Sequence, residues 1–237
     1  MIMISQPTFF PWIGYFDMID QVNIFVVLDD ANFSKQSWHQ RNKFKSKKGM
    51  ELFTVPVKNV NISSKINQIE IFDTDRVVKK FKKFIITNYS KSKYFELYSQ
   101  DIFKVFDKFA KKGNLSNLNF EIIKFFLDIL KIKTKIFLSS DLKIEEKRSE
   151  KIIAICDHFQ RKEYFSSLGA NEYLTEDKNL FIKKNIKIYL HNYEHPTYSQ
   201  LYPPFIPNAC ILDLLFNEGK KSIEIIRQGR KLKKNLF

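Results

Sequence analysis

Gln6 and the adjacent pair Asp29 and Asp30 each follow a short apolar run of strand length. An amide offers a donor and an acceptor at one place, and a carboxylate can take a proton from a reacting group. Neighbouring residues on a strand point to opposite faces, so at most one aspartate is expected to face a site. We expect Gln6 and Asp29 to bind substrate and Asp30 to accept a proton. The alternative for the aspartates is a solvated strand end.

A second motif with several polar and aromatic residues is His195-Pro196-x-Tyr198-x-Gln200. It follows an apolar run and precedes a proline-rich loop. Histidine titrates near neutral pH and can act as a general base. We expect His195 to be catalytic and Tyr198 and Gln200 to bind substrate, although a single histidine is more often structural. Weaker candidates are the other three histidines, His39, His158 and His191.

The first sixteen residues contain an unusual aromatic run, Phe9-Phe10-Pro11-Trp12-x-Gly14-Tyr15-Phe16. Aromatic rings at a strand-to-helix turn can line a nucleotide or sugar pocket, and the positive end of the following helix attracts phosphate. The alternative is that the rings only fill one end of the core. The expected substrate contacts from this run are Phe10, Trp12 and Tyr15.

Cationic side chains follow the second apolar run. Arg41 and Asn42 come after an aromatic loop, a pairing that suits phosphate or carboxylate binding, and Lys35 precedes them. We expect all three to contact substrate. The alternative is that they are solvated surface residues.

The net charge of +14, from 40 basic and 26 acidic residues, is unevenly distributed. Residues 1–30 carry −4, residues 31–96 carry +10 and residues 220–237 carry +6. Such a balance favours a polyanionic partner such as nucleic acid. However, 34 of the basic residues are Lys and only 6 are Arg. Because phosphate and base recognition favours Arg, an A/T-rich genome explains this composition at least as well.

Several classes of protein are disfavoured. Cys156 and Cys210 are the only cysteines and lack metal-ligand spacing, so we expect no metal site and no disulfide framework. There is no P-loop, no G-x-G-x-x-G and no G-x-S-x-G, and we expect no cofactor. The apolar runs are too short to span a bilayer and no secretory signal is evident, so we expect a cytoplasmic protein.

The elements that must position these residues indicate an α/β fold. Strand, turn, helix and strand within 30 residues form a βαβ unit, so two parallel strands are expected, with sites at their carboxyl ends. Gln6 and the aspartates then lie side by side if these strands are neighbours. We expect one domain over residues 1–237 with a mostly parallel sheet, a helical insertion near 76–130 and a basic tail at 220–237. Further strands are expected at 52–57, 66–71, 135–138, 164–167 and 186–193, and a turn at 44–49.

The opening residues loosely resemble those of nucleotidyltransferases of the HIGH superfamily, which begin with a strand, Phe-x-Pro and Gly-His. Here the residues are Phe9-Phe10-Pro11 and Gly14-Tyr15, without the histidine. The resemblance favours a nucleotide-binding, HUP-like topology. It argues against adenylyl transfer by that route, because the missing histidines stabilise phosphate there.

The motifs in combination resemble the WbqC-like family over roughly residues 3–226. They are Gln6-Pro7, Phe10-Pro11-Trp12-x-Gly14-Tyr15-Phe16, Leu28-Asp29-Asp30, Phe33-Ser34-Lys35, Arg41-Asn42, Thr54-Val55-Pro56-Val57-Lys58, His195-Pro196-x-Tyr198-x-Gln200 and Asp213-Leu214-Leu215-Phe216-Asn217-x-Gly219. The resemblance adds Lys58 to the expected substrate contacts. Many relatives carry a Gly-rich stretch where this chain has residues 166–170.

The resemblance implies a bacterial protein encoded with O-antigen and other surface-polysaccharide genes. Such gene clusters encode enzymes that build nucleotide-linked amino sugars and then acylate the amine. The favoured hypothesis is therefore N-acyl or N-aminoacyl transfer onto a nucleotide-linked amino sugar, with aminoacyl-tRNA as one candidate donor. The alternatives are a metal-assisted glycosyltransferase, disfavoured by the missing D-x-D spacing, and a nonenzymatic basic nucleic-acid-binding or assembly factor.

Overall fold

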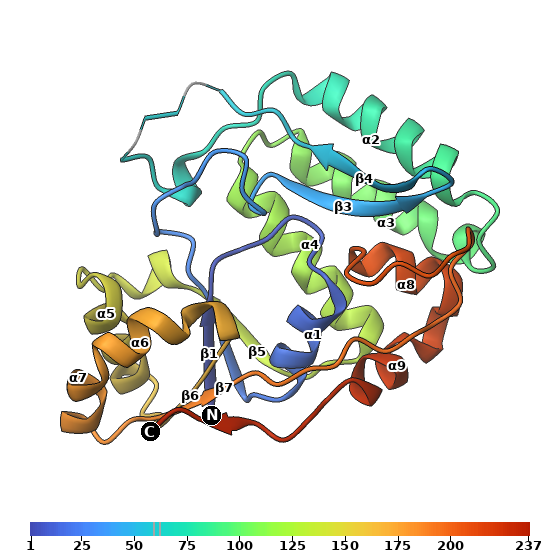
Figure 1. The fold of residues 1–237 in the computed structure, drawn as a ribbon. Coiled ribbons are helices and arrows are strands. Elements are labelled where there is room, and N and C mark those ends of the chain that lie inside the picture. The colour runs from blue at the N-terminus through green and yellow to red at the C-terminus, as the bar shows by residue number, and fades with distance from the viewer. Residues whose placement is uncertain (59, 62) are drawn as a thin grey trace.

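The fold is built on one six-stranded sheet, seen in a computed structural model that describes residues 1–58, 60–61 and 63–237 (Figure 1). The strand order is β5-β2-β1-β6-β7-β8, and all neighbours pair in parallel except β7 and β8. The strands are β1 (Ile2–Ser5), β2 (Ile24–Val27), β5 (Lys135–Leu138), β6 (Glu163–Ser166), β7 (Lys187–Leu190) and β8 (Lys234–Asn235). The expected α/β class and the mostly parallel sheet are confirmed.

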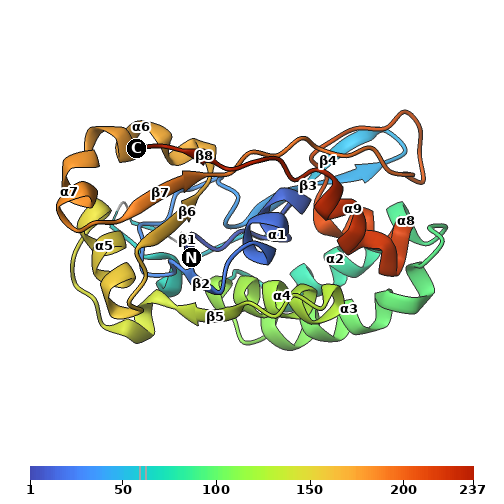
Figure 2. The ribbon, with the colours of Figure 1, turned by 90° about the horizontal axis from the view of Figure 1, so that it is seen from below.

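Helices cover both faces of the sheet (Figure 2). Side chains alternate along β1, so Met3 joins the core beneath α1 and α4, whereas Ile2 and Ile4 join the core beneath α5, α6 and α7. The helices are α1 (Ile13–Asp20), α2 (Thr74–Tyr89), α3 (Phe95–Ala110), α4 (Leu115–Leu130), α5 (Arg148–His158), α6 (Asn171–Glu176), α7 (Lys178–Lys183), α8 (Ile211–Glu218) and α9 (Ser222–Gln228).

The segment between β2 and β5 departs from the sequence expectation. The expected turn at 44–49 is mostly strand: β3 (Arg41–Ser46) and β4 (Gly49–Thr54) form an antiparallel hairpin. β4 ends before Pro56, which has no N–H for a ladder. The expected strand at 66–71 begins instead as a 3₁₀ turn, Ile66–Gln68, because Ile66 and Ile69 are both buried at a spacing of three. The expected helices of the insertion are present as α2, α3 and α4.

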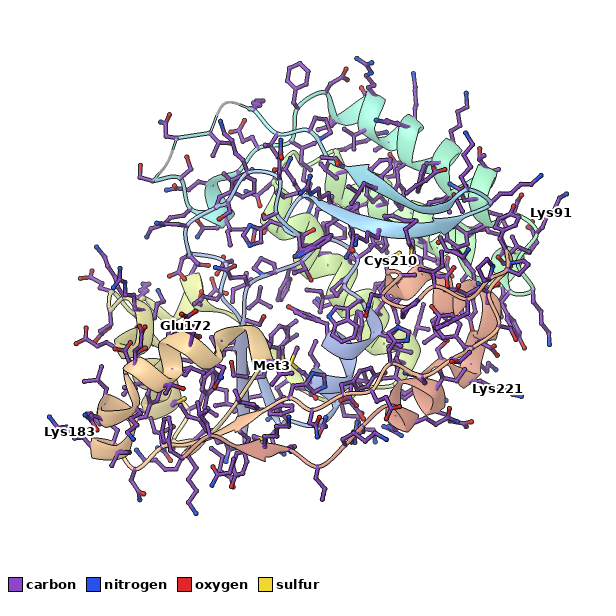
Figure 3. All side chains as sticks on the ribbon, in the orientation of Figure 1. Met3, Lys91, Glu172, Lys183, Cys210 and Lys221 are labelled. Carbon is purple, nitrogen blue, oxygen red and sulfur yellow. The ribbon has the colours of Figure 1, made fainter. Side chains whose placement is uncertain are left out.

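The aromatic run after β1 enters the core between the hairpin and the helices. Phe10 is 1% exposed and stacks on Phe81 of α2, with ring centroids 5.2 Å apart. Its backbone has φ of 41°, and Nδ2 of Asn42 donates to the carbonyls of both Phe9 and Phe10 at 2.9 Å. Phe10 and Asn42 therefore hold a tight turn rather than line a cavity. Side chains fill the space between this hairpin and α8, where Cys210 lies (Figure 3).

A buried carboxylate, Asp17 of α1, ties the start of the chain to its end. Its Oδ1 accepts a hydrogen bond from Arg230 at 2.9 Å, and its Oδ2 accepts from His191 at 2.8 Å and from Gln21 at 2.6 Å. Asp20, one turn further along α1, binds both Arg230 and Arg227. The negative start and the basic tail are thus partners, and the tail itself folds as α9 and β8.

Replacing Asp17 by Ala should lower the free energy of unfolding by about 3–5 kcal/mol, because Arg230 and His191 would lose their buried partner. Urea unfolding followed by circular dichroism measures this. Asp101→Ala is the matched control, because its pair with Lys104 is largely exposed and should contribute less than about 1 kcal/mol. Equal losses for the two variants would contradict the central role of Asp17.

Candidate functional site

The carboxyl ends of β1 and β2 lie side by side, because the two strands are neighbours, which was the condition set from the sequence. The two strands pair in parallel with Ser5 opposite Val27, so Gln6 and the aspartates 29–30 follow neighbouring strands. The chain leaves β1 toward β2 and β5 on one side and later returns to β6 and β7 on the other. The switch point is therefore between β1 and β6, and in open α/β sheets ligands bind in the crevice at such a point.

Gln6 is an exposed amide fixed at this switch point. Its Oε1 lies 3.0 Å from Nε2 of His39, and its backbone carbonyl accepts a hydrogen bond from the Tyr15 hydroxyl at 3.1 Å. Since an amide oxygen only accepts, the His39 imidazole donates through Nε2. The Gln6 amide nitrogen forms no hydrogen bond to another described residue. It can therefore donate to a bound ligand.

His39 was a weak candidate from the sequence, and its surroundings indicate a supporting role. Its imidazole is buried beside Phe33, and burial lowers the pKa to about 4. The ring is therefore neutral at pH 7 and is a poor proton acceptor. Its effect is to orient the Gln6 side chain.

Both aspartates at the end of β2 already have partners. Asp29 is 2% exposed and accepts from the Ser140 amide at 3.0 Å, the Ser140 hydroxyl at 2.7 Å and the Ser139 hydroxyl at 3.0 Å. Asp30 accepts from Ser139 at 2.5 Å and forms an ion pair with Lys151 of α5. Asp29 thus joins β2 to the residues after β5, and the Asp30–Lys151 ion pair lies beside it. A strand was expected at 135–138, but the two serines that follow it and Lys151 were given no role.

His195 lies in a different group of contacts, an aromatic stack beside α1. Its ring is nearly parallel to those of Trp12 and Tyr198, with centroids 6.3 Å and 6.1 Å away. Nδ1 donates to the Pro196 carbonyl at 2.9 Å, and Nε2 is buried without a partner in the described part of the chain. Burial lowers the pKa of this imidazole, so it is neutral at pH 7 with its lone pair on Nε2. That is the protonation state a general base requires.

The stack needs glycine at position 14. A Cβ on Gly14 would lie 2.1 Å from the Trp12 ring, far inside van der Waals contact. The motif Trp12-x-Gly14 therefore lets the indole fold back over the first turn of α1. This places Trp12 against His195.

Tyr198 and Gln200 converge on Asp213, which sequence reasoning did not select as a site residue. The Tyr198 hydroxyl and the Gln200 amide donate to the same oxygen, Oδ2, at 2.8 Å and 2.9 Å. Burial raises the pKa of Asp213 to about 6, although these hydrogen bonds and the charge of the buried Lys45 oppose the rise. Gln200 also binds both backbone groups of Ile206. The cluster shapes the loop that carries His195.

Within the described chain, none of the expected cationic side chains forms a hydrogen bond or ion pair with these groups. Lys58 pairs with Glu70 at 2.5 Å on the surface, Lys35 is exposed, and Arg41 is half-buried on β3. The structure therefore yields three separate groups: Gln6 with His39, the aspartates with Ser139, Ser140 and Lys151, and His195 with Trp12, Tyr198 and Asp213. Tyr15 on α1 contacts the first group, and Trp12, which directly precedes α1, belongs to the third.

A sequence model described as the WbqC-like protein family matches residues 6–225. The chain belongs to the WbqC-like protein family. An uncharacterized protein of Mycobacterium tuberculosis is 30% identical to it over 231 residues, which cover 97% of this chain and 98% of that relative. No solved structure matches the chain. The family match includes all three groups of this WbqC-like chain and ends just before Arg227.

Two negative findings complete the description of the WbqC-like chain. Among residues 1–58, 60–61 and 63–237, no helix is long and apolar enough to cross a membrane. Within the same ranges, no three His, Cys, Asp or Glu side chains gather as metal ligands would.

The buried Asp213 should make stability depend on pH. Its pKa of about 6 exceeds the ordinary 3.8. The folded state therefore retains the proton more tightly, and the favourable contribution present below about pH 4 is lost as pH rises through 6. Relative to Asp213→Asn, the free energy of unfolding of the wild type should fall by roughly 3 kcal/mol between pH 4 and 7, since one pKa unit is about 1.4 kcal/mol. Urea unfolding of both proteins at several pH values measures this difference. If the free energies of unfolding of wild type and Asp213→Asn change with pH in parallel, the prediction is wrong.

Proposed function

We propose that this WbqC-like chain is a transferase of surface-polysaccharide biosynthesis that moves an acyl or aminoacyl group onto a nucleotide-linked amino sugar. The observation that carries the proposal is the Gln6 amide at the switch point between β1 and β6, held by His39 with its nitrogen free to donate. Five parallel strands in the order third, second, first, fourth, fifth along the chain are the arrangement of many nucleotide-binding α/β folds, and this supports a HUP-like topology.

The chemistry needs a neutral amine, a group that accepts its proton and a donor for the developing oxyanion. In this proposal Gln6 supplies an amide donor, and His195 supplies the neutral lone pair of Nε2. The Asp30 carboxylate is less suited to take the proton, because Ser139 and Lys151 already occupy it. The amine nitrogen attacks the acyl carbon, His195 takes the amine proton, and the leaving group departs with the acyl bond electrons.

In this proposal Gln6 and His195 act on one substrate, and both contact residues at the start of α1. The Gln6 carbonyl is bound by Tyr15, and the His195 ring stacks on Trp12. Nε2 of His195 is covered, so the loop that follows it must shift when substrate binds. Trp12 and Tyr198 would then be the apolar walls of the site.

The two alternatives predict different requirements. In a metal-assisted glycosyltransferase, Asp29 and Asp30 would have to leave Ser139, Ser140 and Lys151 to hold an ion. A nonenzymatic nucleic-acid-binding factor would rely on exposed lysines, and Lys91, Lys183 and Lys221 point outward from different corners of the molecule (Figure 3).

The deciding experiment is a mass-spectrometric screen of nucleotide-linked amino sugars with acyl-coenzyme A or charged tRNA as donor. An N-acylated product that forms in the presence of a chelator supports acyl transfer. Loss of the product on ribonuclease treatment assigns the donor to tRNA. Release of free nucleoside diphosphate with a new glycosidic bond would replace the proposal by glycosyl transfer.

Gln6→Glu should abolish most turnover while leaving stability near that of the wild type. The substituted carboxylate can still accept from His39, but it no longer offers the amide N–H to substrate. A loss of roughly 10²-fold or more in kcat/KM is the size expected for an oxyanion donor. Gln100→Ala, an exposed glutamine of α3, is the control. Wild-type turnover in the Gln6→Glu protein would show that the catalytic site does not include Gln6 at this edge of the sheet.

His195→Asn should lower kcat by roughly 10²–10⁴-fold, the usual effect of losing a general base. Because burial lowers the pKa of His195, the acidic limb of the wild-type pH–rate profile should lie below pH 6.5 and vanish in the variant. The control His158→Asn replaces an exposed histidine and should change neither kcat nor the pH–rate profile. A His195→Asn rate within a few-fold of wild type would leave this histidine with a structural role only.

A further inference from the structure

A pocket of about 660 Å³ opens at the opposite edge of the sheet, beside the amino ends of β2 and β5. Four connecting segments contribute to it: the end of α1, the α4–β5 connection, the α5–β6 connection and α9. None of its residues belongs to the groups at the carboxyl edge or around His195. The lining residues are Asp20, Val22, Asn23, Ile24, Lys131, Lys133, Thr134, Lys135, Arg161 and Arg227.

The pocket is strongly cationic. Lys131, Lys133, Lys135 and Arg161 form no ion pair with any described residue. Asp20 is the one carboxylate among the lining residues, and Arg227 and Arg230 already neutralise it with contacts of 2.8 Å and 2.6 Å. Four positive charges therefore face the pocket without a protein counter-ion.

Arg161 provides an independent indication of a ligand. Its Nε is buried and has no partner within the described residues. A buried N–H without an acceptor is costly and rare in folded proteins. A guanidinium matches the oxygen geometry of phosphate with two parallel hydrogen bonds. A phosphate bound by the Arg161 guanidinium would satisfy this donor once the side chain turns its Nε–H toward the pocket.

A simpler explanation is that these cations only neutralise helix ends, because α1, α4 and α5 all finish near this edge. The carbonyls there already have other donors. The Thr134 hydroxyl donates to Ile19 and Val22 at 2.7 Å and 2.9 Å, and backbone amides satisfy the last turn of α4. None of the four free cations hydrogen-bonds a helix carbonyl within the described chain. Helix-capping hydrogen bonds therefore do not use these cations, and their charges act on the negative ends of the three helices only through space.

We propose that this pocket binds a compact, phosphate-bearing anion of nucleotide size, such as a nucleoside diphosphate, at a second site separate from the carboxyl edge. The volume lies within the range of about 300–1,000 Å³ that is usual for small-molecule sites. Its concave shape, with cations from several loops, suits a compact ligand better than an extended RNA backbone. The inference does not depend on the transferase proposal.

The test is isothermal titration of the full chain with pyrophosphate at low and moderate salt. Arg161→Gln, and separately Lys133→Ala with Lys135→Ala, should each weaken pyrophosphate binding at least tenfold. The matched control is Lys79→Ala with Lys83→Ala, two exposed lysines of α2, which should stay within twofold of wild type. Because Lys133 and Lys135 are exposed, the double variant should fold even if Arg161→Gln does not.

Other outcomes would overturn the inference. The inference is wrong if pyrophosphate does not saturate the wild-type protein in the millimolar range. It is also wrong if the α2 control variant weakens pyrophosphate binding as much as the pocket variants do. Binding of bulk tRNA that the pocket variants abolish, without any pyrophosphate binding, would make this surface an RNA contact instead. Gln6→Glu should leave pyrophosphate binding unchanged. A failure of the transferase proposal at the carboxyl edge can therefore be distinguished from a failure of the anion-site proposal at the amino edge.

Discussion

The buried carboxylate of Asp17 is the constraint on which the arrangement of the chain depends. It is completely buried, and its oxygens are shared among His191 at the end of β7, Gln21 and Arg230. A charge in that position is tolerated only when hydrogen bonds replace its hydration. The position of α1 against the sheet, and with it the placement of Trp12 and Tyr15, is thereby linked to the segment between α9 and β8.

Local pattern was sufficient to predict the first βαβ unit, which places Gln6 and Asp29 side by side once its strands are neighbours. The helical insertion was also predicted, because its apolar positions recur at helical spacing. The β3–β4 hairpin was not predicted. Lys45 looks like a surface residue in the sequence, yet it is buried on β3, and no local signal distinguishes such a lysine. The contacts of Asp17 were equally hidden, since they depend on residues more than 170 positions away.

The chemistry of the candidate site could be predicted only in part, because it also depends on contacts between distant segments of the chain. Residue type singled out Gln6 and His195 as candidates, but the orientation of the Gln6 amide and the protonation state of His195 depend on burial and on partners from distant segments. The aromatic run was open to two interpretations, and Phe10 proved to be part of the core. Net charge gave the least information about the site, because it does not distinguish arginines paired with Asp20 from the unpaired cations at the amino edge of the sheet.

The closure of α1 by Arg230 has a consequence for biosynthesis. The two partners of the Asp17–Arg230 pair are 213 positions apart. At about 5–20 residues per second, a ribosome needs roughly 10–40 s to make the second after the first. During that interval the Asp17 carboxylate lacks its arginine partner. The ion pair that links α1 to the segment after α9 therefore forms late in synthesis.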